Sequence, residues 1–254
     1  MGNVSYYAIK TIFYYKIKEF FFEFQYTIIS PLISIFVFFG IITILSDNFI
    51  FSNDTDYSKF VIPGFIIMIV MQTSYNNISE NLITMKQVGS FYDYLISPIS
   101  RTEILFSLII SNIFMSLFLA SISMLFFSFF VSFNSINYFS FLYYLFITSI
   151  IFTSFGSIIG FLFFTWDIQQ AISNFIIVPI SLLSGTFFSL DVVNKKWIFL
   201  FEYNPFYLIV KNFRNSFDEI LFISYKTELY IFFITFLFLS VAIFVFKKGY
   251  KVIQ

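Results

Sequence analysis

The side chains that most often perform catalysis are scarce in this sequence. It has no His and no Cys, so the commonest general base, the commonest metal ligand and every thiolate site are excluded. Serine occurs throughout, but without a His the usual base for a serine nucleophile is missing, and nothing supports a Ser–Lys pair. No metal-ligand motif and no Gly-rich phosphate-binding loop is found. The sequence therefore predicts a chain that is not an enzyme and binds no metal or cofactor itself.

One polar cluster interrupts an otherwise apolar stretch near residue 75. Its amides are Gln72, Asn76 and Asn77, with Thr73, Ser74 and Ser79 beside them. Amides within an apolar helix have two interpretations. They can line the path of a transported substrate, or they can hydrogen-bond to neighbouring helices at about 0.6–2 kcal/mol per contact. The residue types alone leave both interpretations open.

The composition indicates which solvent surrounds these residues. The 254-residue chain is 59% hydrophobic and only 11% charged, with a mean hydropathy of +0.89, whereas soluble domains are about 25% charged. Much of the surface must therefore face lipid. The 44 Phe residues allow an aromatic-lined path, although a bias toward AT-rich codons explains them more simply. The formal net charge is zero, which gives no basic footprint for nucleic acid.

Charged residues divide the chain into apolar stretches, and a bilayer span takes about 20 helical residues. Four charge-free stretches hold 18 to 23 residues, and a fifth, between Glu103 and Asp167, holds 63 and must turn back once, at the Asn/Ser cluster 132–137. Strand-like alternation is absent, so the spans are helices. We predict an all-α polytopic membrane protein, one domain over 1–254, with six transmembrane helices near 25–46, 61–79, 104–131, 138–165, 168–190 and 229–246. By these bounds no span contains an ionisable residue, which argues against ion-coupled transport.

Three further segments complete the predicted architecture. Residues 5–24 form an amphipathic helix, with Ile9, Phe13 and Ile17 on the apolar arc and Lys16 on the polar arc, that would lie in the membrane interface. The long segment 190–227 forms a re-entrant external hairpin or a surface-lying helix pair between spans five and six. Eight Lys/Arg lie on the side of the termini and six on the other, five of them in that long segment, so both termini are predicted to be cytoplasmic.

The loop 80–103 carries its own signals. Apolar residues recur at helical spacing, which predicts a short helix along the membrane that is interrupted at Gly89 and Ser90. Ser100 and Glu103 fit a capping box at the start of the third span. In the fourth span, Gly156 and Gly160 form a GxxxG pair, which is typical of close helix packing.

A series of short motifs resembles one family. Pro63-Gly64 opens the second span, residues 85–104 read MKQVGSFYDYLISPISRTEI, residues 183–188 read LSGTFF, and Asn204-Pro205-Phe206 and Arg214 follow. In order and spacing this series, covering about residues 1–250, resembles the ABC-2 type permeases, the transmembrane subunits of ATP-binding-cassette exporters. One departure is the segment 191–196, DVVNKK, where the family pattern leads us to expect a Pro-containing turn.

The resemblance implies a function for each segment. Residues 86–97 would form the helix that docks in a groove of the ATPase and couples it to transport, with contacts from Lys86, Gln87, Gly89, Ser90, Tyr92, Asp93, Leu95 and Ser97. Asn204 and Pro205 would lie in the re-entrant hairpin, and residues 5–24 would be the interfacial connecting helix. The substrate path would form at a dimer interface from spans one, two and five, with Gln72, Asn76 and Asn77 as candidate lining.

The resemblance also implies the partners. The chain would pair as a homodimer, or with a related permease, in the cytoplasmic membrane of a bacterium, surrounded by lipid. Two copies of a cytoplasmic ATPase subunit would bind ATP and Mg²⁺ and drive export of a drug, lipid or glycan. Two other classes stay open on the residues alone: a secondary transporter or channel that works without an ATPase, and a membrane-embedded enzyme or assembly scaffold.

Overall fold

The structure is a computed structural model that describes residues 6–46, 57–131, 133, 135–188, 194–217 and 224–249. Throughout these residues the regular elements are helices, which confirms the all-α prediction. Ser132 and Asn134 of the predicted turn, and residues 191–193 of the departure from the family pattern, lie outside the described part of the chain.

Side-chain caps set the beginnings of several helices. α5 (Arg101–Phe127) begins with the predicted capping box: the Ser100 amide donates to Glu103 Oε2 at 2.7 Å, and the Glu103 amide donates to Ser100 Oγ at 3.3 Å. α6 (Tyr138–Leu162) begins at Asn137, whose side chain accepts from the Ser140 amide at 3.1 Å. These contacts satisfy amides that a helix leaves unpaired in its first turn.

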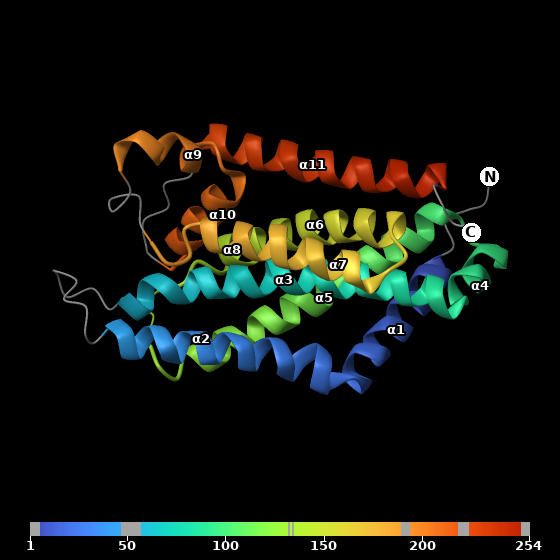
Figure 1. Ribbon diagram of the computed structural model, residues 1–254, viewed down its shortest axis with the longest axis horizontal. Coiled ribbons are helices and arrows are strands. Elements are labelled where there is room, and N and C mark those ends of the chain that lie inside the picture. Colours follow the sequence, from blue (N-terminus) through green and yellow to red (C-terminus); the bar gives the residue numbers. More distant parts are fainter. Residues whose placement is uncertain are drawn as a thin grey trace.

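The long helices lie side by side along the long axis of the molecule (Figure 1). α3 (Tyr57–Val88), α5 and α6 form the centre, α11 (Tyr225–Lys248) covers α6 on one side, and α2 (Ser30–Ser46) lies against α3 on the other. Three consecutive helical pieces, α7 (Trp166–Ile172), η2 (Ser173–Ile177) and α8 (Val178–Leu183), run beside α3. The polar cluster is therefore carried by the central helix.

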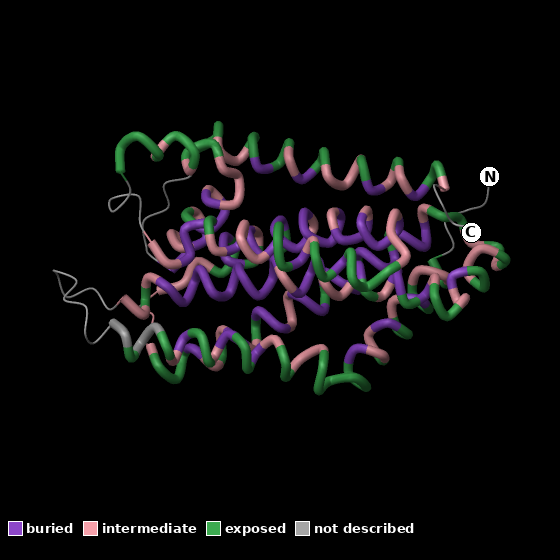
Figure 2. Tube along the Cα trace, viewed as in Figure 1, coloured by how far each residue is buried: buried purple, intermediate pink, exposed green. Residues whose placement is uncertain are grey.

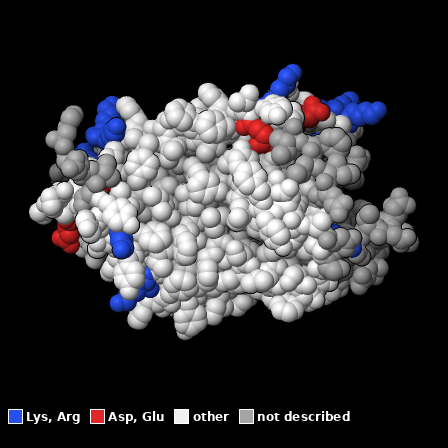
Figure 3. Space-filling model, turned by 180° about the vertical axis from the view of Figure 1, so that it is seen from behind, with Lys and Arg blue, Asp and Glu red and all other residues white. Residues whose placement is uncertain are grey.

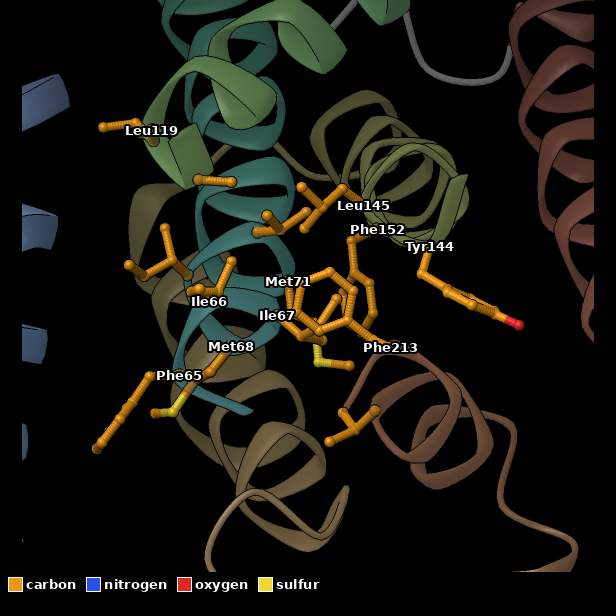
Figure 4. Packing of buried hydrophobic residues seen from close by; sticks show 14 of the residues in the cluster. Phe65, Ile66, Ile67, Met68, Met71, Leu119, Tyr144, Leu145, Phe152 and Phe213 are labelled. Carbon is orange, nitrogen blue, oxygen red and sulfur yellow. The ribbon is translucent and has the colours of Figure 1, made fainter. Parts of the chain in front are cut away.

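α3 is buried along most of its length, as the buried colour of the central helices shows (Figure 2). Its apolar side chains pack against residues of α5, α6 and α10 (Pro205–Asn215), including Leu119, Leu145 and Phe213 (Figure 4). Lipid tails are as apolar as these side chains, so close packing rather than removal from water holds such helices together. The outer faces of α2 and α11 expose large apolar side chains instead.

The surface charge agrees with a membrane environment. Seen from behind, charged side chains gather toward the two ends and leave a broad uncharged band between them (Figure 3). Among the described residues, four helices are long and apolar enough to span a bilayer: α3, α5, α6 and α11. The pair Tyr6–Phe22 and Gln25–Ile41 adds a fifth if its 79° bend is counted within one span.

The predicted count of six spans is therefore not reproduced by helix length alone. The first predicted span begins in a π-helical turn, η1 (Gln25–Ile29), directly after the bend. The fifth predicted span is divided by the π-helical turn η2, and its described helix ends at Leu183 rather than near residue 190. The described part of the chain thus supports four or five spans, and the six-span arrangement stays a prediction.

The N-terminal helix forms as predicted, but with a shifted buried face. α1 (Tyr6–Phe22) packs against α5 and buries Ile12, Lys16 and Phe20, which recur every four residues. Lys16, expected on the polar arc, is buried, whereas Phe21 on the expected apolar arc is exposed. The reason is a local partner: the Lys16 ammonium donates to Glu19 at 2.6 Å, which stabilises the buried charge.

The helix of the second span is longer than the predicted span. α3 continues past residue 79 to Val88, so that Glu80 and Lys86 lie within the helix. The expectation of spans without ionisable residues stays a prediction, because the 32 residues of α3 exceed the roughly 20 that a bilayer span needs. Gly89 then takes φ +84°, and α4 (Ser90–Ile96) begins in a new direction. A left-handed φ costs other L-residues about 1–2 kcal/mol, so glycine fits this corner best. We call the end of the molecule that holds this corner the α4 end.

Short helices occupy the opposite end. η4 (Lys195–Trp197), α9 (Ile198–Glu202) and α10 lie away from α4 (Figure 1). Asn204 caps α10 by accepting from the Phe206 amide at 2.9 Å, and Pro205 fills the first helical position. These pieces are too short to cross a bilayer. A helical segment between the last two predicted spans is thus present, and its depth in the membrane stays a prediction.

Candidate functional site

The polar cluster of α3 divides into two parts with different surroundings. Asn76 Oδ1 accepts from Gln169 Nε2 at 3.1 Å and from Ser173 Oγ at 2.9 Å. Gln72 Nε2 donates to Ser181 Oγ at 3.3 Å. These contacts join α3 to α7, η2 and α8, so Gln72 and Asn76 have the surroundings that the hydrogen-bonding interpretation requires.

Asn77 has different surroundings. It lines a cavity of about 200 Å³ between α1, α3 and α5. Its buried Nδ2 has no hydrogen-bond partner among the described residues. Of the three predicted lining amides, Asn77 alone faces this cavity, and the three do not form one surface.

Two buried amides that matter here were missed by the sequence analysis. Gln169 Nε2 bonds to Asn76 and, at 3.2 Å, to Ser79 Oγ. Asn112 on α5 donates through Nδ2 to the Ser74 carbonyl and to Thr153 Oγ1, both at 2.7 Å. Asn112 thereby joins α5, α3 and α6. The signal was available, since Asn112 is an isolated amide in a long apolar stretch, and such a residue indicates an interhelical partner.

α3 and α6 approach each other closely where α6 carries two glycines. A Cβ on Gly156 would lie 2.6 Å from the Tyr75 carbonyl oxygen, and one on Gly160 would lie 2.9 Å from Ser79 Cα. Both positions meet backbone atoms, which cannot move aside as a flexible side chain can. The two helices therefore depend on glycine at this contact.

α4 presents a mixed face at its end of the molecule. Phe91 is buried, and its ring packs edge-on against Phe161 of α6 at 6.2 Å. On the other side of α4, Ile96 is 84% exposed and Tyr92 and Asp93 are also exposed, and Val88 at the end of α3 is 75% exposed. Leu95 is half-buried, and Ser97 bonds back to the Tyr94 carbonyl at 2.6 Å. A short helix anchored by one aromatic thus holds apolar side chains out into solvent.

Lys86 and Gln87 are not part of α4. The Lys86 ammonium donates to the carbonyl of Phe161 at 3.0 Å and to that of Phe163, and it lies 4.1 Å from the centre of the Phe164 ring. Gln87 donates to the Phe164 carbonyl at 2.7 Å. The predicted helix over 86–97 is therefore shorter, at 90–96, because these two side chains belong to the last turn of α3. There they cap the carboxyl end of α6.

A groove lies next to α4. It has a volume of about 620 Å³ and is formed by α1 on one side and by α4 and the following residues on the other. Its lining is largely aromatic and aliphatic, including Tyr7, Ile12, Tyr94 and Ile99. Together with the exposed residues of α4, this groove gives the α4 end an apolar surface beside polar and charged side chains.

The far end is held by two anchors that carry charge. Arg214 on α10 donates to the Phe60 carbonyl at 3.0 Å and to the Gly185 carbonyl at 2.9 Å, and its guanidinium lies 3.6 Å from the centre of the Phe60 ring. Burial lowers the pKa of Arg214 to about 10, so this residue stays charged at neutral pH.

The second anchor is Glu228 in the first turn of α11. Its carboxylate accepts from Tyr144 at 2.6 Å, from Tyr143 at 3.0 Å and from Asn212 at 3.1 Å. It thereby joins α6, α10 and α11. In the sequence, Glu228 marks only the edge of the last predicted span, and nothing there indicates this contact.

Comparison with known proteins identifies the family of this chain. The sequence profile of the ABC-2 type transporters matches residues 7–217, from α1 to the residues that follow α10. The chain belongs to the ABC-2 type transporter family. It is 23% identical over 222 residues to the inner membrane transport permease YadH of Escherichia coli strain K12, which covers 85% of each chain. A permease of the same name from Shigella flexneri matches to the same extent.

Membership makes the chain the membrane component of a transporter. ABC-2 type permeases work with an ATPase subunit, and the sequence of this chain contains no nucleotide-binding loop of its own. The apolar helices and the uncharged band agree with an integral membrane protein.

Proposed function

We propose that this chain is the permease subunit of an ATP-driven exporter in the bacterial cytoplasmic membrane. Two copies would pair with two copies of a separate ATPase subunit that holds ATP and Mg²⁺. The substrate would be a drug, a lipid or a glycan, and its path would run between the two permease copies. The names of the relatives support the membrane and the transport role.

The observation that carries the proposal is α4. This helix is separated from α3 by one left-handed glycine, is anchored by the buried Phe91, and exposes Ile96, and Val88 at the end of α3 is exposed beside the corner. Single exposed apolar residues are common on protein surfaces, but Ile96 stands between Tyr94 and Ser97 of the apolar groove, and a partner with a matching surface would bury both the groove and Ile96. Burial of one such side chain contributes about 1.5–3 kcal/mol.

The orientation follows from the same end of the molecule. α11 ends with Lys247 and Lys248 beside α4, and Arg101 donates to the Lys247 carbonyl at 3.3 Å. In membrane proteins, the short loops and chain ends on the cytoplasmic side carry an excess of lysine and arginine. The proposal therefore has the α4 end in the cytoplasm, within reach of the ATPase.

The test is co-purification of the tagged full-length chain from its native membrane in mild detergent. Wild-type protein should carry a stoichiometric ATP-binding-cassette subunit. Ile96→Glu should remove that subunit while leaving the yield and thermal stability of the permease unchanged, since Ile96 makes little contact within the chain. Tyr225→Glu is the matched control: Tyr225 is a similarly exposed apolar residue at the opposite end.

The outcomes separate the function classes. A permease that retains its ATPase in the control and loses it in Ile96→Glu supports the proposal. A homo-oligomer that never carries an ATPase, yet still transports, supports a secondary transporter or channel.

A further inference from the structure

The cavity between α1, α3 and α5 has an unusual lining for a membrane helix bundle. It is walled by Phe20, Ile78, Leu108 and Met115 but also holds four charged side chains and three amides. The charged residues are Lys16, Glu19, Glu23 and Glu80. None of the proposed contacts with an ATPase uses them, since α4 and its groove are formed by other residues.

The charges in this lining do not balance. Lys16 is 5% exposed and its ammonium is paired with Glu19 at 2.6 Å. The carboxylates of Glu23 and Glu80 therefore have no cation beside them within the described part of the chain. Two negative charges on one cavity attract a positively charged ligand, and they do so more strongly where lipid lowers the effective dielectric constant.

The unpartnered amide oxygens of the cavity indicate that a ligand must bring hydrogen-bond donors. Asn112 is 4% exposed, and both of its described hydrogen bonds are made by Nδ2, so its Oδ1 is left without a partner. Since the Ser74 carbonyl can only accept, the orientation of this amide is fixed. Asn81 Oδ1 is likewise buried and unpartnered. A buried acceptor without a donor costs about 1–3 kcal/mol, so the cavity favours a ligand that brings N–H groups.

Water can supply the hydrogen-bond donors that the cavity lacks, but not the positive charge. Polar cavities of this size commonly hold ordered water, which would satisfy the amide oxygens. Water does not neutralise Glu23 or Glu80. A primary ammonium does both, because it carries one positive charge and three donors in a compact group. A quaternary ammonium carries the charge but has no N–H to donate.

The position of the cavity suggests where such a group comes from. The cavity lies where α1 turns by 79° toward α2, next to the α4-end half of α3. Carboxylates avoid the hydrocarbon region, so Glu19, Glu23 and Glu80 mark the level of lipid headgroups. An ammonium could therefore arrive on a lipid headgroup from the membrane or as a free amine from solution.

We infer that the α1–α3–α5 cavity is a binding site for a primary ammonium group. Glu23 and Glu80 supply the charge, and the Oδ1 atoms of Asn81 and Asn112 accept its hydrogens. The site is separate from the surface at α4, and its occupancy does not depend on pairing with an ATPase.

The test uses purified full-length protein in nanodiscs and native mass spectrometry. Discs are made with phosphatidylethanolamine, whose headgroup ends in a primary ammonium, or with phosphatidylcholine, whose headgroup ends in a quaternary one. Free ethanolamine is titrated separately into phosphatidylcholine discs, with KCl at equal ionic strength as the reference. Wild-type protein should retain phosphatidylethanolamine or bind ethanolamine saturably, and KCl should have no such effect.

Variants decide whether the cavity is the site. Glu80→Gln keeps the size of an exposed side chain and should weaken ammonium binding about tenfold, the change expected for loss of about 1.4 kcal/mol. Glu23→Gln should act in the same direction. Glu202→Gln, which removes an exposed carboxylate on α9 far from the cavity, is the matched control and should bind like the wild type.

Each result has a defined meaning. Retention of phosphatidylethanolamine that Glu80→Gln abolishes supports a lipid source, and saturable ethanolamine binding that Glu80→Gln abolishes supports a free amine. Equal retention of the two lipids without ethanolamine binding means a water-filled cavity and overturns the inference. Ammonium binding that is unchanged in both Glu80→Gln and Glu23→Gln overturns it as well.

Discussion

At the scale of single residues, the amides of α3 have distinct contacts although they are neighbours in sequence. Asn76 is bonded to α7 and η2, whereas Asn77, one position along, lines the α1–α3–α5 cavity. Successive residues point about 100° apart on a helix. A step of one residue along α3 is therefore enough to change which helix an amide contacts.

Asn76→Leu should destabilise the protein, and Asn77→Leu should not. The first change leaves Gln169 and Ser173, both buried, with fewer acceptors, at a cost of about 1–3 kcal/mol. The second removes a donor that has no partner, so the melting temperature in detergent should be unchanged or higher. A thermal shift assay of both variants measures this. Equal losses in the two would show that Asn77 also bonds to another helix.

Gly156→Ala should separate α6 from α3. The added methyl would lie 2.6 Å from the Tyr75 carbonyl oxygen, and forcing extra volume into such a contact costs about 1–3 kcal/mol. A lower melting temperature, measured by size-exclusion fluorescence after heating, is expected. Gly40→Ala is the control because no atom lies within 4 Å of its added Cβ. If both variants melt alike, the close approach does not limit stability.

At the scale of elements, the corner between α3 and α4 depends on one backbone angle. Gly89→Ala places a side chain in open space, so any effect comes from φ alone. The cost of about 1–2 kcal/mol should alter the direction of α4 and reduce ATP-driven transport in reconstituted vesicles. The amount of permease in the membrane should not fall. Normal transport by this variant would mean that the corner tolerates other geometries.

The sequence predicted helix type better than helix ends. Apolar stretches located α3, α5, α6 and α11, and the pair Ser100 and Glu103 located the start of α5. The predicted second span ends at residue 79 because Glu80 is the first charged residue after the apolar stretch, but α3 itself continues to Val88. A charge does not end a helix, since the backbone bonds continue through it, and Gly89 is the residue that does.

Three other structural features are only weakly indicated by the sequence: the π-helical turns, the burial of Lys16 and the partners of the buried amides. The π-helical turns η1 and η2 shift the faces of the helices that follow them, and no pattern of apolar residues marks such a turn. Lys16 illustrates the same limit, because its burial depends on the contact of α1 with α5 and on Glu19. Asn112 and Gln169 were visible as isolated amides, but only the packing of the helices identifies their partners.

At the scale of the whole molecule, α2 has one face that its own chain does not cover. It exposes Ile33, Val37, Phe38 and Ile41 and lies at the edge of the bundle (Figure 1). In the proposed homodimer this face would meet a second copy, since span one is expected at the dimer interface. The outer face of α11, on the other side of the bundle, would meet lipid.

This arrangement can be tested by crosslinking, because the chain has no native Cys. Val37→Cys should form a disulfide-linked dimer in membranes treated with a mild oxidant. Phe236→Cys, on the exposed face of α11, is the matched control and should stay monomeric on a non-reducing gel. Crosslinking at position 236 but not at 37 would place the interface on the opposite side.

The unbroken length of α3 has a mechanical consequence. Its 32 residues form a rod of about 48 Å at 1.5 Å per residue, which runs from the Arg214 anchor to the corner at Gly89. Lys86 and Gln87 fasten the last turn of this rod to the end of α6, so the two helices cannot slide past each other there. A displacement of α4 would therefore reach α3 and α6 together, through the corner at Gly89 and the bonds of Lys86 and Gln87.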